Sequence, residues 1–341
     1  MIPKSGKPAS AEAHAAKKKP NVSEIKHSQL PVNGIEMHVA ECGEGPLVLM
    51  CHGWPELGYS WRHQLTALGE AGFRAVAPDM RGFGRTSAPD DVAAYTIFHN
   101  VGDIVALVSA LGEKRALIAG HDWGAPVAWH AALMRPDIFP AVCAMSVPHR
   151  QRGHTAPLET LKKAGKGDYY WLYFQERAAE EEFARDPRFT IKRLFHIGFG
   201  ATPREDKMSL YVDRAKGFLG APRDVPLPAW LSEADIDVFA AEYQRTGFRG
   251  GLNWYRNIDR NWELTAPWHD AKILQPALFI AGANDAVITG SMGQRALDEL
   301  ETVVPNLQCK LLLDGAGHWI QQERPAEVNA ALISFAREHL A

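Results

Sequence analysis

The pattern of apolar and polar positions divides the chain into segments that predict different structures. From about residue 24, apolar and polar residues alternate in SEIKHSQL and GIEMHVAEC, on either side of Val32-Asn33-Gly34. Strict alternation predicts strands with one buried face, and Asn-Gly between two such strands predicts a tight hairpin turn.

Short runs that are apolar on both faces follow the hairpin. They are PLVLMCHG, FRAVAPD, RALIAG and IFPAVCAMSV, and the pattern returns near the C-terminus in ALFIAG and QCKLLLDG. Helical periodicity separates them, in SWRHQLTALGEAG, across residues 97–112 and in HDWGAPVAWHAALM. Strands buried on both faces, alternating with helices, predict an α/β fold with a mostly parallel, doubly wound sheet and helices on both sides.

The strand pattern stops between residues 148 and 265. Amphipathic helical stretches replace it, such as YYWLYFQERAAEEEFARD and SEADIDVFAAEYQRTG, and Ser232 with Asp235 predicts an N-terminal helix cap. We therefore predict a helical cap domain over 148–265, inserted into one α/β core formed by 24–147 and 266–341.

Composition and charge narrow the possible functions. The chain is 46 % hydrophobic and 23 % charged, with a net charge of −3 and both signs scattered, so we expect no nucleic-acid partner. No run of about 18 apolar residues predicts a membrane span. Residues 1–23 lack the apolar segment of a secretory signal and are expected to form a disordered tail.

Four cysteines lie far apart, without a CxxC pair or a nearby histidine at ligand spacing. This favours reduced, buried cysteines in a cytoplasmic protein over a disulfide framework or a metal site. We expect no metal and no cofactor.

Gly120-His121-Asp122-Trp123-Gly124 follows an apolar strand and opens a helix, the setting of a nucleophile elbow. The glycines permit a strained turn that presents one side chain at the carboxyl end of the strand. Taken alone, Asp122 could simply cap the helix. As a nucleophile, an ionised carboxylate needs no activating base, and its attack on a saturated carbon gives an alkyl ester. The residue type therefore favours epoxides or alkyl halides as substrates.

Hydrolysis of such an ester requires an activated water. His318 follows the strand CKLLL in a glycine-rich loop, and Asp285 follows the strand ALFI. An imidazole is a suitable base for water, and a carboxylate is suited to orient it. The order nucleophile, acid, histidine is the one expected for this kind of fold. Either residue alone would be read as an ordinary loop residue.

At this point a family resemblance covers residues 27–340. HGWPELGYSWRHQ, DMRGFGRTS, GHDWGAPVAW, GANDAV and GAGHWIQQERPAEVN resemble the soluble epoxide hydrolases of the α/β-hydrolase superfamily. The resemblance implies an α/β-hydrolase fold with a helical cap (lid). It also implies that the backbone amides of Trp54 and Trp123 form an oxyanion hole.

The resemblance further implies two cap tyrosines that protonate the epoxide oxygen. Tyr255 lies in GFRGGLNWYRN, and Tyr170 lies five residues before Gln175 in YYWLYFQ. Tyr169 and Tyr173 are adjacent candidates for the first donor.

The sequence thus predicts an epoxide hydrolase that converts an apolar epoxide and water into a vicinal diol, as a monomer or homodimer. A haloalkane dehalogenase using the same Asp122 is an alternative, although Trp54 stands where dehalogenases commonly have Asn or Glu. A ligand sensor without turnover is a second alternative, disfavoured by the complete set of nucleophile, acid and histidine.

Overall fold

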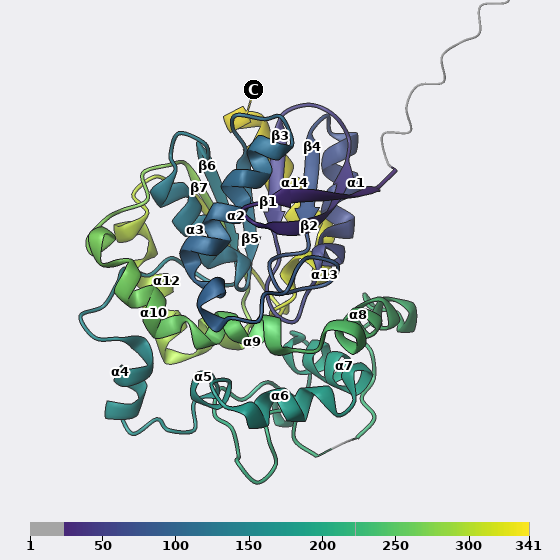
Figure 1. Ribbon diagram of the computed structural model, residues 1–341, viewed down its shortest axis with the longest axis vertical. Helices are drawn as coiled ribbons and strands as arrows, with labels where there is room; N and C mark the ends of the chain where they lie inside the picture. Colours follow the sequence, from purple (N-terminus) through teal and green to yellow (C-terminus); the bar gives the residue numbers. More distant parts are fainter. Residues whose placement is uncertain (1–23, 222, 341) are drawn as a thin grey trace, which may run out of the picture.

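The structure, a computed structural model, describes residues 24–221 and 223–340, and the predicted tail over 1–23 lies outside them. Its centre is one eight-stranded sheet in the order β1-β2-β4-β3-β5-β6-β7-β8 (Figure 1). The strands are β1 (Lys26–Val32), β2 (Ile35–Cys42), β3 (Leu47–Cys51), β4 (Arg74–Pro78), β5 (Leu117–His121), β6 (Ala141–Met145), β7 (Ala277–Gly282) and β8 (Leu307–Leu313).

The predicted hairpin is confirmed. β1 and β2 pair antiparallel from Val32 and Ile35 outward, and Asn33 and Gly34 between them have φ values of 46° and 79°. Positive φ at both central residues is what a two-residue hairpin turn demands, and it explains the Asn-Gly pair. β2 pairs antiparallel with β4, and the pairs from β3 and β4 through to β7 and β8 are all parallel.

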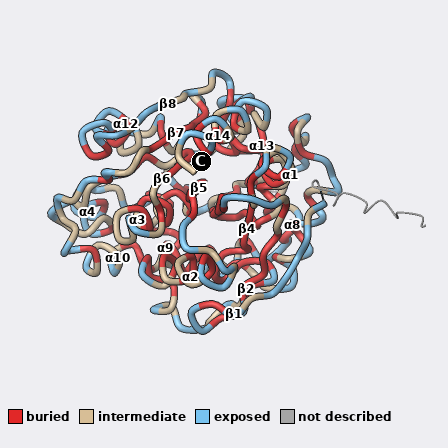
Figure 2. Tube along the Cα trace, turned by 90° about the horizontal axis from the view of Figure 1, so that it is seen from above, coloured by how far each residue is buried: buried red, intermediate tan, exposed pale blue. Residues whose placement is uncertain are grey.

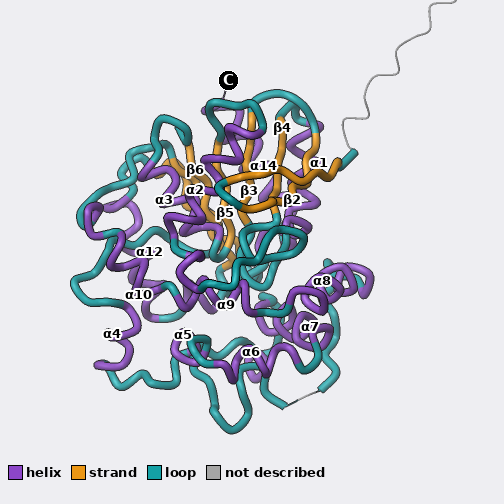
Figure 3. Tube along the Cα trace, in the orientation of Figure 1, coloured by secondary structure: helices purple, strands orange, loops and turns teal. Residues whose placement is uncertain are grey.

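Both faces of the sheet carry helices, which confirms the doubly wound α/β-hydrolase prediction. In β3, Leu47 and Leu49 belong to one hydrophobic cluster, and Val48 and Met50 belong to the other. Residues of α2 (Ile97–Ala110), α3 (Gly124–Met134) and α12 (Ser291–Val303) pack into the first cluster, and those of α1 (Arg62–Glu70) and α14 (Pro325–Leu340) into the second. Figure 3 shows the strands enclosed by helices. Figure 2 shows that many of the buried residues, in red, lie toward the centre of the molecule.

β8 differs from the expected pattern of strands buried on both faces. It pairs only with β7 at the edge of the sheet, and most of its residues are exposed or half-buried. The expectation of buried cysteines is therefore wrong for Cys309, which is exposed on β8, whereas Cys42, Cys51 and Cys143 are buried.

The segment between β6 and β7 contains helices and no sheet strand among the residues described. Figure 1 shows most of it as a layer beneath the sheet. Its helices are α4 (Pro157–Lys163), α5 (Tyr170–Tyr173), α6 (Arg177–Ala184), α7 (Pro187–Gly198), α8 (Glu233–Thr246), α9 (Arg249–Arg256) and α10 (Ile258–Leu264). Short helices α11 (Ala286–Thr289) and α13 (Ile320–Glu323) follow β7 and β8.

The stretch YYWLYFQERAAEEEFARD, expected to be helical throughout, is two helices. Glu176, between α5 and α6, has an extended backbone (φ −90°, ψ 151°). At the same break the Gln175 amide donates to the Trp171 carbonyl oxygen (2.8 Å) and to the Tyr255 carbonyl oxygen (3.0 Å). This tie between α5 and α9 is a tertiary contact that periodicity does not reveal.

No helix within the described ranges is long and apolar enough to cross a bilayer.

The predicted cap of α8 is present as a full capping box between Ser232 and Asp235. We expect Ser232→Ala to lower the free energy of unfolding by about 1 kcal/mol, because the Asp235 amide at the helix start loses the Ser232 hydroxyl that accepts its hydrogen bond. Urea unfolding followed by circular dichroism measures this. Ser291→Ala is the matched control, since Ser291 is the first residue of α12 while Gly290 holds the cap position. Equal effects of the two variants would contradict a specific role for the cap.

Candidate active site

Asp122 sits on a strained turn between β5 and α3. Its φ is 50°, a region that favours glycine, so the turn is held by its surroundings. A Cβ on Gly120 would lie 2.0 Å from the Gly124 carbonyl oxygen, and one on Gly124 would lie 2.0 Å from the Cys51 carbonyl oxygen. Neither Gly120 nor Gly124 has room for a side chain. This close packing fixes the turn that carries Asp122.

The Asp122 carboxylate contacts two of the predicted site residues directly. The Trp54 amide donates to Asp122 Oδ1 (2.7 Å), and His318 Nε2 lies 3.4 Å from Asp122 Oδ2. The Trp54-Pro55 peptide bond is cis. The Trp123 amide, one residue beyond Asp122, makes no hydrogen bond to this carboxylate among the residues described.

His318 and Asp285 form a second close pair. His318 Nδ1 lies 3.0 Å from Asp285 Oδ2, while the Val287 amide donates to Asp285 Oδ1 at 2.8 Å. Burial alone would lower the pKa of His318. The carboxylates of Asp285 and Asp122 outweigh burial and raise that pKa well above its usual value of 6.5. The imidazole is therefore held between two carboxylates.

Tyr170 and Tyr255, on α5 and α9, line the same two cavities as Asp122. Both are buried, and their ring centroids lie 6.0 Å apart. Burial is the main cause that raises the pKa of each hydroxyl well above 10, and the Asp122 carboxylate adds to it in both cases. Both tyrosines are thus neutral hydrogen-bond donors near neutral pH.

The neighbouring tyrosines point elsewhere. The Tyr173 hydroxyl donates to Glu182 at 2.6 Å and lines neither cavity at the site. Tyr169 packs against Tyr170, with ring centroids 5.1 Å apart, and lines only the larger cavity. Of Tyr169, Tyr170 and Tyr173, Tyr170 is the one that lines both of the cavities that Asp122 lines.

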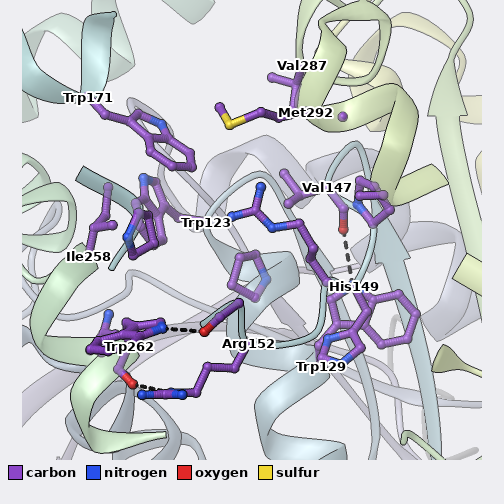
Figure 4. Close-up of a pocket in the computed structure, with 18 of the residues that line it drawn as sticks. Trp123, Trp129, Val147, His149, Arg152, Trp171, Ile258, Trp262, Val287 and Met292 are labelled. Carbon is purple, nitrogen blue, oxygen red and sulfur yellow. Dashed lines mark hydrogen bonds between the residues drawn. The ribbon is translucent and has the colours of Figure 1, made fainter. Parts of the chain in front are cut away.

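Two cavities meet at these groups. The larger has a volume of about 380 Å³ and the smaller about 30 Å³. The residues that line both are Asp122, Tyr170, Tyr255 and Val287, and His318 lines the smaller one. Figure 4 shows part of the larger cavity, with Trp123, Trp171, Ile258, Val147, Val287 and Met292 around it. Asp122, Tyr170 and Tyr255 therefore lie where the larger cavity, with its aromatic lining, meets the smaller cavity beside His318.

A buried ion pair beneath the site was not anticipated from the sequence. The side chains of Glu56 and His121 are fully buried, with His121 Nδ1 2.6 Å from Glu56 Oε2. His121 Nε2 lies 2.7 Å from the His318 carbonyl oxygen. Both of these neighbours can accept hydrogen bonds, so the His121 ring bridges the Glu56 carboxylate and the backbone at His318.

Glu56 also connects the loops around the site. It accepts hydrogen bonds from the Gly53 amide (3.2 Å) and from the Gln321 side chain (2.7 Å). Burial alone would raise its pKa, but the facing His121 outweighs burial and lowers it from 4.5 to about 2. The pair thus ties the turn that carries Trp54, the elbow and the loop of His318 into one network.

Glu323 is a second buried carboxylate that the sequence did not reveal. It accepts hydrogen bonds from the amides of Gly317 (2.8 Å), Trp319 (3.1 Å) and Gly200 (3.2 Å). Burial raises its pKa. Because Glu323 is the last residue of α13, its carboxylate can hold Gly317 and Trp319, the two neighbours of His318. The same carboxylate binds Gly200, in the segment between β6 and β7.

Within the residues described, no group of three or more His, Cys, Asp or Glu side chains is arranged to hold a metal ion.

Comparison with known proteins agrees with this architecture. A family model described as the alpha/beta hydrolase fold matches residues 46–325. Epoxide hydrolase A of Mycobacterium tuberculosis is 44 % identical over 89 % of this chain and 94 % of its own length. An epoxide hydrolase of Caballeronia sordidicola is 41 % identical over 92 % and 94 % of the two chains. The solved structure of an epoxide hydrolase from an endophytic Streptomyces is 44 % identical and superposes with a TM-score of 0.87, covering 92 % of this chain and 95 % of that one.

The chain therefore belongs to the alpha/beta hydrolase fold family and, within it, to the epoxide hydrolases. This confirms the resemblance inferred from the motifs.

We expect Glu56→Gln to lower the free energy of unfolding by about 3 kcal/mol, because it removes the buried carboxylate that faces His121 and accepts hydrogen bonds from Gly53 and Gln321. Glu113→Gln is the matched control, since Glu113 pairs with Arg74 near the surface and its loss costs about 1 kcal/mol or less. Denaturant unfolding measures both.

The pH dependence gives a second check on the same pair. A lowered folded-state pKa means that ionised Glu56 stabilises the fold above about pH 4.5, and that this contribution disappears as the pH falls toward about 2. The stability difference between the wild type and Glu56→Gln should therefore shrink over that range. A difference that grows on acidification would contradict the ion pair.

Proposed function

We propose that this protein hydrolyses epoxides to vicinal diols through a covalent ester on Asp122. The observation that carries the proposal is the meeting of one carboxylate and two neutral tyrosine hydroxyls at the junction of two cavities, with a His–Asp pair behind the carboxylate. The names of the relatives support the same reaction.

In the first step, Asp122 attacks a carbon of the epoxide ring. The C–O bond of the ring breaks, and the oxygen takes a proton from a tyrosine hydroxyl as it leaves. Tyr170 and Tyr255 are suited to this because burial keeps both protonated, and a hydroxyl donor stabilises the oxygen most when it carries developing charge. The turn at Gly120 and Gly124 holds the attacking oxygen in place.

The proton that His318 carries at rest first returns to the tyrosinate left by ring opening. In the second step, neutral His318 deprotonates a water that attacks the ester carbonyl of Asp122. The tetrahedral intermediate then collapses, the bond between the carbonyl carbon and the diol oxygen breaks, the departing oxygen takes the proton back from His318, and the Asp122 carboxyl group gives up its own proton to His318. Before ring opening, two carboxylates raise the pKa of His318. Ester formation removes the charge on Asp122, so one of the two causes is lost and the pKa of His318 falls when a base is needed. The small cavity beside His318 has the volume of about one water molecule.

The oxyanion formed in that step needs donors. The Trp54 amide already bonds Asp122 Oδ1 at 2.7 Å, so it is in place for the oxygen that becomes the ester carbonyl oxygen. The Trp123 amide is proposed as the second donor on account of its position after the nucleophile.

Halide displacement is disfavoured as the alternative. A halide leaving group needs N–H donors and no acid, and the indole groups of Trp54 and Trp123, which line the smaller and the larger cavity, do not by themselves decide between the two reactions. Two neutral tyrosine donors suit an alkoxide leaving group.

His318→Gln should accumulate the ester, because ring opening does not need the histidine and hydrolysis does. Incubation with styrene oxide should raise the protein mass by one molecule of styrene oxide, located on the Asp122 peptide by mass spectrometry. The double variant Asp122→Ala/His318→Gln is the control and should gain no mass. An adduct that persists in the control would place the nucleophile elsewhere.

Tyr170→Phe and Tyr255→Phe should each slow ring opening by about 100-fold, the scale of a lost general acid, and the double variant should be slower still. Single-turnover formation of the ester from styrene oxide measures the step. Tyr173→Phe is the matched control, because its hydroxyl bonds Glu182 away from the site. A loss as large in Tyr173→Phe would overturn the assignment of Tyr170.

A further inference from the structure

The loop that carries His318 is fixed through its backbone as well as through its imidazole. The His318 amide donates to the Gly198 carbonyl oxygen at 2.8 Å. The His318 carbonyl oxygen lies 2.7 Å from His121 Nε2 and accepts a hydrogen bond from the Ser146 hydroxyl at 2.9 Å. These contacts come from three separate parts of the chain, so the position of the proposed base depends on long-range packing.

One of those parts is the end of α7, in the helical segment between β6 and β7. The Phe195 carbonyl oxygen, in the last turn of α7, accepts a hydrogen bond from the Trp319 indole at 3.0 Å. A Cβ on Gly317 would lie 2.3 Å from the Gly198 carbonyl oxygen and 2.3 Å from the Gly200 amide nitrogen. The His318 loop and the end of α7 therefore meet backbone to backbone, without space for a side chain between them.

The Glu323 carboxylate binds both sides of this contact. Its Oε2 accepts hydrogen bonds from the Gly317 amide at 2.8 Å and from the Gly200 amide at 3.2 Å, and its Oε1 accepts one from the Trp319 amide at 3.1 Å. Three backbone donors from two chain segments thus converge on one side chain, and two of them flank His318. Among the residues described, Glu323 makes no ion pair with a basic side chain.

Stability alone does not explain this carboxylate. Taking a carboxylate out of water costs free energy, which hydrogen bonds offset only in part when no cation faces it. Burial raises the pKa of Glu323 in spite of the three amides, whereas the pKa of Glu56, which faces His121, is lowered to about 2. The ionised form of Glu323 is therefore less favourable in the folded chain than in water, unlike that of Glu56. What Glu323 does provide is a fixed position for the two amides beside His318.

Glu323 does not touch the reacting groups. It is buried and lines neither cavity, so any effect on the reaction passes through His318. His318 Nε2 lies 3.4 Å from Asp122 Oδ2, and its Nδ1 lies 3.0 Å from Asp285 Oδ2. A catalytic group has to be held within about 0.5 Å of its productive position, which a loop rich in glycine does not achieve without outside support.

We propose that Glu323 is a positioning residue for the hydrolytic step, and that it acts by fixing the His318 loop against residues 198–200. This rests on the proposed ester mechanism. Ring opening needs Asp122 and the two tyrosines, whereas hydrolysis of the ester needs His318 at a fixed distance from it. Displacement of the loop therefore slows the second step and leaves the first unchanged.

Glu323→Gln tests the proposal, because glutamine keeps the shape of the side chain but offers one acceptor oxygen instead of two. With styrene oxide, ester formation in a single turnover should stay within about threefold of the wild-type rate, while ester hydrolysis should slow by roughly 10- to 100-fold. In the steady state, kcat and KM should fall together and kcat/KM should hardly change. A purely structural role would reduce the fraction of active protein, which lowers kcat and kcat/KM equally and leaves KM unchanged.

Glu182→Gln is the matched control. Glu182 also accepts two backbone amide hydrogen bonds, from Phe218 at 3.0 Å and from Leu219 at 2.9 Å, but these amides belong to the segment between α7 and α8. The ratio of the hydrolysis rate to the ester-formation rate should not fall by more than about threefold in this variant. An equally large fall of that ratio in Glu182→Gln, or equal slowing of both steps in Glu323→Gln, would overturn the proposal.

Hydrogen exchange read by mass spectrometry separates this proposal from the proposed reaction. In Glu323→Gln, peptides that cover residues 196–202 and 315–321 should exchange faster than in the wild type by roughly tenfold, and Glu182→Gln should leave both unchanged. If diol forms without an ester on Asp122, the proposed reaction fails, and exchange still decides whether Glu323 holds the two segments together. Unchanged exchange in both segments of Glu323→Gln would refute the positioning role even where epoxides are turned over.

Discussion

The site depends on one backbone constraint, the left-handed turn at Asp122. Neither glycine of the elbow has room for a side chain, because carbonyl oxygens of neighbouring segments fill the space a Cβ would need. The close approach of β3, β5 and α3 that excludes those side chains also brings the Trp54 amide to 2.7 Å from the Asp122 carboxylate. The packing of the sheet against α3 therefore also positions the Asp122 carboxylate.

The turn at Asp122 also determines which charged groups lie close to His318. Asp122 and Asp285 flank His318, which lines the smaller cavity, while the buried pair of Glu56 and His121 lies beneath them. The buried pair holds the His318 carbonyl oxygen, so the histidine loop is fixed from below by a charge that the reaction does not consume. In our account, ester formation removes the charge of Asp122 and leaves Glu56 and His121 unchanged. The pKa of His318 then falls, so that the imidazole can act as a base.

Much of this could be predicted from local pattern. Apolar runs located the inner strands, Asn-Gly located the hairpin, and Ser232 with Asp235 located a helix start, since each signal is encoded within a few residues. The strand β8 was predicted, but its exposure was not, and neither was the break between α5 and α6, because both features depend on which neighbours the segments meet. The Glu56–His121 pair was missed for the same reason, as its partners are 65 residues apart. Spacing favoured Tyr170, but only its place at both cavities distinguishes it geometrically from Tyr169.

The central claim, a covalent ester on Asp122, is tested most directly by one turnover in ¹⁸O-labelled water with enzyme in excess over styrene oxide. Water attacks the ester carbonyl in this account, so the label should enter the Asp122 carboxylate and the first diol should contain no ¹⁸O. Digestion and mass spectrometry read out both products. Label in the diol of the first turnover, with an unlabelled Asp122 peptide, would mean that water opens the ring directly and would contradict the account.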